Sequence, residues 1–182
     1  MANYRLTDKS ALNENPASDD KLMLVDTSDT SSSSAGTSKQ IDNKFLIQTD
    51  KLVLSNANIQ ALDNTGSAGA FQVLVDTSGS GFSIIPLSIA IFVTYASSTE
   101  SSNSNLYVGF DPTSTSSYWT YFNRFMNGVP VDVPFIQATP TSSTAGVGGT
   151  TTDNTRLHLY ASNNFNGGWS ATVYTTYTVI KL

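Results

Sequence analysis

Alternation of apolar and polar residues with a period of two dominates the second half of the chain. In PLSIAIFVTY, one face of an extended strand holds Leu87, Ile89, Ile91, Val93 and Tyr95. In the last fifteen residues, one face holds Trp169, Ala171, Val173, Tyr177 and Val179. Successive side chains of a strand point to opposite faces, so both segments are predicted to be half-buried strands.

Shorter strands are predicted in NLYVGF, YWTYFNRF, VPVDVPFIQ and RLHLY, between loops rich in Gly, Pro, Ser and Thr. In YWTYFNRF, strict alternation places Tyr118, Thr120 and Phe122 on one face, and Trp119, Tyr121 and Phe125 on the other. One of these faces is expected to build the core and the other a subunit interface. Several short strands joined by such loops predict an all-β chain with an antiparallel, jelly-roll-like β-sandwich.

Three regions are expected along the chain. Residues 1–50 hold few apolar residues and many turn formers, which predicts an extended arm. Residues 51–85 are expected to connect this arm to a sandwich head over residues 86–182. Within these regions, DNKFLIQTDKLVL and SNANIQALD have helix-like apolar spacing, and FQVLVDTSGSGFSII predicts a tight hairpin with its turn at SGSG. Because a sandwich of this size has a modest core, a homotrimer is expected.

Charge and composition exclude several kinds of partner. The net charge is -5, and residues 86–182 hold three Lys or Arg and four Asp or Glu, so no basic patch for nucleic acid is expected. With no cysteine and one histidine, neither a metal site nor a cofactor is expected. No apolar run reaches the roughly 20 residues of a membrane span, and MANYRLTDKS lacks the apolar core of a signal peptide.

The pentapeptide LVDTS occurs twice, at residues 24–28 and 74–78, and raises the possibility of a paired catalytic site. An apolar pair followed by Asp-Thr resembles the active-site loop of aspartic proteases, but Ser28 and Ser78 stand where that loop has glycine. The alternative is an aspartate that ends a strand and opens an Asx turn. Elsewhere, Glu100, Asp111, Asp132 and Asp153 are too isolated to predict a glycosidase pair. No catalytic residue is predicted, and the protein is not expected to be an enzyme.

The segment DDKLMLVDTSDTSSSSAGTSKQIDNKFLI, preceded by YRLTDKSALNENPAS, resembles a segment near the N-terminus of tailed-bacteriophage virion proteins. These include tail fibres, head fibres and capsid decoration proteins. The resemblance covers about a quarter of the chain and implies a β-hairpin that docks by adding strands to a neighbour's sheet. The residues of this docking arm are Leu6, Leu12, Leu22, Leu24, Val25, Ile41 and Phe45.

The resemblance implies a virion structural protein whose variable head follows the docking arm. One arm and one small head favour a capsid decoration protein, of the cement or head fibre type, bound to the major capsid protein or another virion protein. The alternative is a tail fibre or tail-tip adhesin that binds host surface glycans. The aromatic residues available for glycans or for a subunit interface are Tyr118, Trp119, Tyr121 and Trp169.

Overall fold

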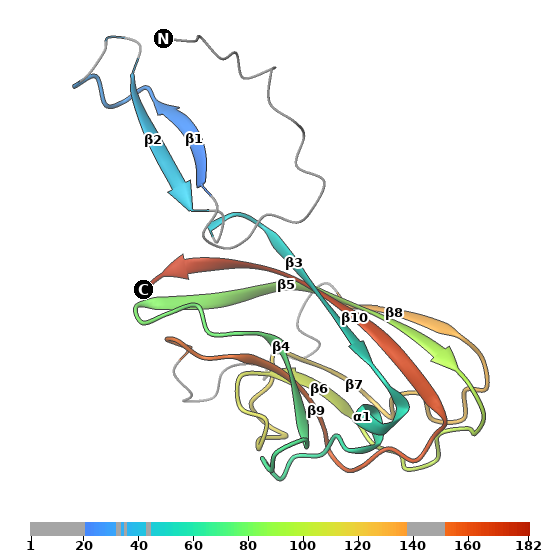
Figure 1. Ribbon diagram of the computed structural model, residues 1–182. Helices are drawn as coiled ribbons and strands as arrows, with labels where there is room; N and C mark the ends of the chain where they lie inside the picture. Colours follow the sequence, from blue (N-terminus) through green and yellow to red (C-terminus); the bar gives the residue numbers. More distant parts are fainter. Residues whose placement is uncertain (1–20, 32–33, 35, 43–44, 138–151) are drawn as a thin grey trace. The chain divides into compact units, whose positions relative to one another are not determined.

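A computed structural model describes residues 21–31, 34, 36–42, 45–137 and 152–182 (Figure 1). The chain forms two units, Met1–Leu46 and Ile47–Leu182, and each is described by itself. Strands make up almost all of the regular structure in the described residues, with one short helix, α1 (Asn56–Gln60). The predicted all-β class is therefore confirmed.

The first unit contains a two-stranded antiparallel sheet, β1 (Lys21–Asp26) and β2 (Thr37–Asp42). In its register Leu22 lies opposite Ile41 and Asp26 lies opposite Thr37. The hairpin predicted for this segment is thus present, with the Ser-rich stretch between its two strands.

The second unit is built from two four-stranded sheets. Sheet one has the order β3 (Gln48–Leu54), β10 (Trp169–Lys181), β5 (Phe82–Tyr95) and β8 (Val133–Gln137). Sheet two has the order β4 (Phe71–Val75), β9 (Leu157–Ala161), β6 (Leu106–Gly109) and β7 (Thr120–Phe122). Every strand pair in both sheets is antiparallel.

The order of strands in the two sheets defines a jelly roll. Along the chain, each connection from β3 to β10 crosses from one sheet to the other, except the one between β6 and β7. Eight strands arranged in this way form the two interlocked Greek keys of a jelly roll. The antiparallel sandwich predicted from the sequence is confirmed.

The core lies between the sheets because side chains alternate along β10 and along β5 from Ser88 to Thr94, beyond a register shift at Leu87. On β10, buried residues alternate with half-buried ones from Trp169 to Val179. Ile89, Ile91 and Val93 of β5 are buried on the same side of sheet one, against Val108 and Leu159 of sheet two.

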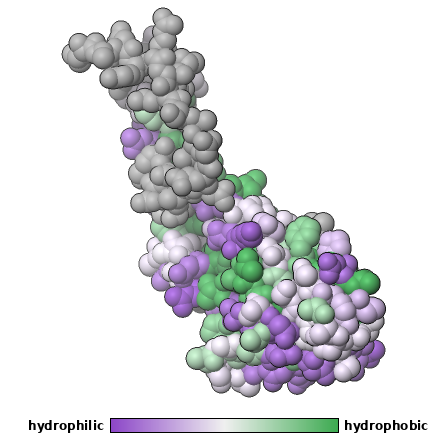
Figure 2. All heavy atoms as spheres, turned by 45° about the vertical axis from the view of Figure 1, so that its right-hand side comes forward, coloured by the Kyte–Doolittle hydropathy of each residue, from purple (hydrophilic) through white to green (hydrophobic). Residues whose placement is uncertain are grey.

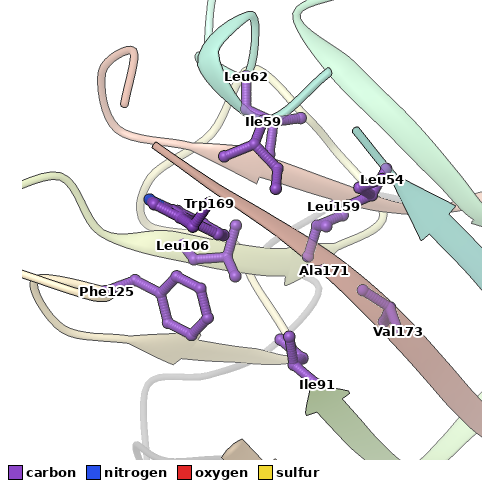
Figure 3. Close-up of a pocket in the computed structure, with 10 residues that line it drawn as sticks. All are labelled: Leu54, Ile59, Leu62, Ile91, Leu106, Phe125, Leu159, Trp169, Ala171 and Val173. Atoms are coloured by element: carbon purple, nitrogen blue, oxygen red, sulfur yellow. The ribbon is translucent and has the colours of Figure 1, made fainter. Parts of the chain in front are cut away.

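One end of the core is closed by α1 and by aromatic rings. Ile59, Leu62, Phe125 and Trp169 line an apolar cavity of about 10 Å³ in this region (Figure 3). A space of that size barely accommodates one water molecule, so this end of the core is close-packed.

The predicted boundary between connector and head differs from the structure. β3 and β4 come from residues 51–85 or begin just before them, and they pair with β10 and β9 respectively. The segment predicted as a connector therefore supplies an edge strand to each sheet. Each of these strands pairs with a strand far away in the sequence.

Two local predictions in this region are wrong, and one is confirmed. FQVLVDTSGSGFSII is not a hairpin, because β4 pairs with β9 while β5 pairs with β10. DNKFLIQTDKLVL is not helical at its end, since pairing with β10 makes Gln48–Leu54 a strand. The helix predicted in SNANIQALD is α1, whose first turn is closed by a capping box between Ser55 and Asn58.

In YWTYFNRF the strand is shorter than predicted. β7 covers only Thr120–Phe122, and Arg124 and Met126 adopt positive φ angles of 45° and 63°, which end the extended backbone. The predicted alternation fails outside those three residues. Trp119 and Phe125 pack against the core on the same side as Phe122.

Because Ile91 is buried between the two sheets, replacing it with alanine is expected to leave a cavity. We expect Ile91→Ala to lower the free energy of unfolding by about 2 to 5 kcal/mol. Chemical denaturation followed by circular dichroism measures this change. Thr94→Ala, at an exposed position of the same strand, is the control and should change stability by no more than about 0.5 kcal/mol. Equal effects of the two substitutions would contradict the proposed core.

Candidate functional site

The hairpin of the first unit exposes apolar side chains on both of its faces. The exposed fractions are 48% for Leu22, 72% for Met23 and 57% for Val25. Met23 and Val25 share one face, and Leu22 lies on the other, because side chains alternate along a strand. Within the described residues, each strand of this sheet pairs only with the other. An isolated two-stranded hairpin is marginally stable in water, and this one exposes apolar residues on both faces.

Aspartate side chains fix the start of the loop between β1 and β2. Asp26 Oδ1 accepts hydrogen bonds from the backbone N–H of Ser28, at 3.0 Å, and from its hydroxyl, at 2.6 Å. These bonds lower the pKa of Asp26. Asp29 pairs with Lys39 and accepts a bond from the backbone N–H of Ser31, and its pKa is lowered to about 2, mainly by Lys39. The first LVDTS therefore ends a strand and opens an Asx turn.

The second LVDTS also ends a strand, by a different set of contacts. β4 ends at Val75, and Asp76 Oδ1 accepts bonds from Thr77 N–H, at 2.8 Å, and from Arg156 Nε, at 2.7 Å. This ion pair lowers the pKa of Asp76. In each copy of LVDTS, the aspartate carboxylate thus accepts hydrogen bonds at the end of a strand.

The predicted docking residues differ in whether the structure describes them and in how exposed they are. Leu6 and Leu12 lie outside the described residues. Leu24 pairs with Lys39 through the backbone. Ile41 is half-buried, and Phe45 is exposed. Met23, the most exposed apolar residue of the hairpin, was not in the predicted set. Its place between Leu22 and Leu24 in an alternating strand is the signal that identifies it.

The aromatic residue predicted at position 169 is not at the surface. Trp169 is 2% exposed and packs edge-on against Phe125 and Phe165, with ring centroids 5.4 and 5.3 Å away. It is the first inward residue of β10, which explains its burial. Trp169 is therefore not available to bind a glycan or another subunit, and Trp119 is half-buried against the core.

Tyr118 and Tyr121 belong to a cluster of four tyrosines on the outer face of sheet two. Tyr107 of β6 stacks between Tyr160 and Tyr121, its cross-strand neighbours, at centroid distances of 5.4 and 5.8 Å. The ring of Tyr118 contacts those of Tyr107 and Tyr121. Tyr107 and Tyr160 are buried, whereas Tyr118 and Tyr121 are half-buried. Burial of Tyr107 and Tyr160 was not predicted, because NLYVGF and RLHLY place them on the polar side of their strands.

The loop between β6 and β7 covers this tyrosine cluster. The Tyr160 hydroxyl donates a 2.7 Å hydrogen bond to the carbonyl of Ser114. The backbone of Ser117 and Tyr118 lies so close to Gly109 that a Cβ there would be 3.1 Å from Tyr118 Cα. The tyrosine part of the outer face of sheet two is therefore covered by the chain's own loop.

The carboxylate of Glu100 joins two loops at one end of the sandwich. Glu100 is 1% exposed and accepts hydrogen bonds from the backbone N–H groups of Ser102, Asn166 and Gly167, at 2.8 to 3.0 Å. Burial raises the pKa of Glu100, but hydrogen bonds from Ser102, Gly167 and Asn166 lower it by more, so the net shift is downward. This arrangement holds the loops in place.

The remaining isolated carboxylates also bind backbone N–H groups. Asp132 accepts a bond from Tyr95 and Asp153 one from Gly81, at 2.8 and 2.7 Å. Asp111 opens an Asx turn with Thr113. In the described part of the chain, no three His, Asp or Glu side chains gather in a way that could hold a metal ion.

His158 lies on the outer face of sheet two beside the tyrosine cluster. Its ring packs edge-on against Phe71 at a centroid distance of 5.0 Å, and the residue is 8% exposed. Burial lowers its pKa.

Among the described residues, no helix is long and apolar enough to span a bilayer.

Comparison with known proteins gives a weak structural similarity. No protein-family model and no curated protein matches the sequence. Among solved structures, a chain of the "Cyanophage Pam1 capsid asymmetric unit" is similar, with a TM-score of 0.35 and 13% sequence identity. The alignment covers 72% of this chain and 81% of that chain. It is a similarity to one chain of a phage capsid assembly.

Replacing Glu100 with glutamine is expected to destabilise the second unit, because the charge-assisted bonds to three backbone N–H groups would be weakened. We expect a loss of about 2 kcal/mol in the free energy of unfolding at neutral pH. Since the folded-state pKa of Glu100 is lowered, its contribution is present above the unfolded pKa and is lost as pH falls through the folded pKa.

The measurement is the melting temperature of both proteins from pH 7 to pH 3. The difference between them should be largest above about pH 5 and should shrink in acid. Asp111→Asn is a control, because Asp111 bonds only locally to Thr113 in an exposed turn. If the difference in melting temperature between wild type and Glu100→Gln does not change with pH, the lowered pKa of Glu100 is contradicted.

Proposed function

We propose that the protein is a structural component of a tailed-phage virion, and that its hairpin docks on the capsid. The observation that carries the proposal is the first unit, a two-stranded hairpin with exposed apolar side chains on both faces. Free strand edges bind partners by adding strands to a neighbouring sheet, and alternating side chains then fix the register. The sequence resemblance of this segment to the N-terminal segments of virion proteins supports the same role.

In this proposal the protein is a decoration protein of the cement or head fibre type. The hairpin binds the major capsid protein or another virion protein, and the jelly roll forms the head. The head is proposed to assemble as a homotrimer, with no catalytic activity and no cofactor. Jelly rolls occur in viral capsid proteins and also in lectins, so the fold is compatible with this role without specifying it.

The alternative is a tail fibre or tail-tip adhesin. Tyr118 and Tyr121 are half-buried and present part of their rings near the β7 edge of sheet two, where a sugar ring would stack. Burial of Trp169 removes one of the aromatic residues on which this alternative depended. Location on the particle separates the two roles.

Immunogold electron microscopy of purified virions, with antibody against residues 47–182, tests the location. Label over the heads is the expected result. Label on the tail would favour the adhesin, and absence of label from the particles would contradict both roles.

A binding experiment tests the hairpin itself. Wild-type protein should bind to particles that lack it, and Val25→Asp should reduce the number of bound copies about tenfold or more. A buried unpaired carboxylate costs well over the roughly 1.4 kcal/mol that corresponds to a factor of ten. Val131→Asp is the matched control, since Val25 and Val131 are each 57% exposed and only the first lies on the hairpin. Equal binding by both variants would show that the hairpin does not dock.

A further inference from the structure

The outer face of sheet one differs from an ordinary solvent-facing sheet surface in its lack of charge. Lys51 is the one charged residue among the outward positions that the structure describes on these strands. The others include Thr49, Val53, Ile85, Ser88, Ala90, Phe92, Thr94, Pro134, Ser170, Thr172, Tyr174, Thr176, Thr178 and Ile180. Solvated faces of antiparallel sheets are usually polar, whereas a scarcity of charge with aromatic residues is typical of the centre of an interface.

Several apolar side chains on this face lie in one row across the sheet. The register aligns Val53 of β3, Thr172 of β10, Phe92 of β5 and Pro134 of β8. Val53 is 66% exposed and Phe92 is 48% exposed. Tyr174, in the next row, contacts the ring of Phe92 edge-on at 5.9 Å, and Lys51 Nζ lies 5.8 Å from the Tyr174 ring centroid. These residues form one patch, and the exposed Ile85 and Ile180 lie further along β5 and β10.

The two outer faces of the sandwich differ in how much of each is covered by other parts of the second unit. The loop between β6 and β7 covers the tyrosine cluster on sheet two. Within the second unit, no described strand or helix packs over the outer face of sheet one. In the view of Figure 2, hydrophobic residues of the second unit reach the surface between hydrophilic residues and residues of intermediate hydropathy.

We propose that the outer face of sheet one binds a second copy of this chain. Its electrostatics favour such a partner, because a nearly uncharged face offers little to a charged protein and meets its own copy with few like-charge contacts. Its shape also fits, since the exposed ring of Phe92 lies beside a shallow, open depression lined by Phe92, Thr172 and Tyr174. A surface that carries both a projection and a hollow can be complementary to itself.

The size of the face is sufficient for a stable contact between copies. A residue in a sheet occupies about 16 Å² of one face, because strands lie about 4.8 Å apart and rise about 3.3 Å per residue. Strands of 7, 13, 14 and 5 residues therefore present roughly 600 Å² in flat projection. This is close to the roughly 800 Å² that each partner buries in a standard interface.

A face that binds its own copy makes a two-fold contact, so this contact is separate from the homotrimer proposed above, and it holds whether or not the protein is found on virions. Sedimentation velocity of the purified chain over a range of concentrations tests it without any virus particle. Wild-type protein should sediment as a dimer, or as a larger species with an even number of chains. Phe92→Glu should raise the dissociation constant at least about 100-fold, because it places a charge at the centre of the contact.

Two further variants make the test specific to this face. Val53→Glu lies in the same row as Phe92 and should have the same effect, which keeps the test valid if Phe92→Glu does not fold. Val73→Glu is the matched control, because Val73 is an exposed valine of β4 in sheet two, and it should sediment as wild type does. Circular dichroism confirms that each variant is folded.

Loss of assembly in both sheet-one variants, with assembly kept in Val73→Glu, supports the proposal. A monomeric wild type at all concentrations overturns it. It is also overturned if folded Phe92→Glu and Val53→Glu keep the wild-type mass, or if all three variants dissociate alike.

Discussion

The antiparallel pairing of β5 with β10 is the constraint on which the second unit depends. β10 pairs with β5 from Trp169 to Lys181, and on its other side it pairs with β3. Both long strands keep a period of two, so one face of each must lie in the core and the other must point away. Sheet two packs on the inward rows, and α1 closes one end of them. The same alternation that builds the core therefore also creates the uncharged outer face.

Strands with uninterrupted alternation could be predicted from the sequence, and strands defined by their partners could not. The segments around Ile91 and Val173 alternate over ten or more residues, so they were identified as half-buried strands. β3 contains the run Leu52, Val53, Leu54, which fits a helix as well as a strand, and pairing with β10 decides between them. Nor does a periodic pattern say which strands are neighbours. SGSG at residues 78–81 has the composition of a tight turn, yet it joins strands that lie in different sheets.

The hairpin of the first unit followed from its alternation and its resemblance to virion proteins, whereas the buried polar contacts of the second unit did not follow from any local pattern. Glu100 stands in SSTESSNSN, a context that predicts exposure to solvent. Two of its partners, Asn166 and Gly167, are more than 60 residues away in the sequence. Trp169 was named both as part of an alternating strand and as an aromatic residue available for glycans or a subunit interface, and its burial excludes the second interpretation. Its place at the start of an alternating strand was the better guide.

The position of β10 has a consequence for how the protein folds as it is synthesised. β10 is the last strand of the jelly roll to leave the ribosome, but it occupies an interior position of sheet one, between β3 and β5 (Figure 1). Until it emerges, β3 and β5 have no backbone partners on the sides that will face it. Such long-range pairing folds slowly, and unpaired strand edges favour aggregation. Closure of sheet one is therefore delayed until β10 has emerged, although every strand of sheet two precedes it in the chain.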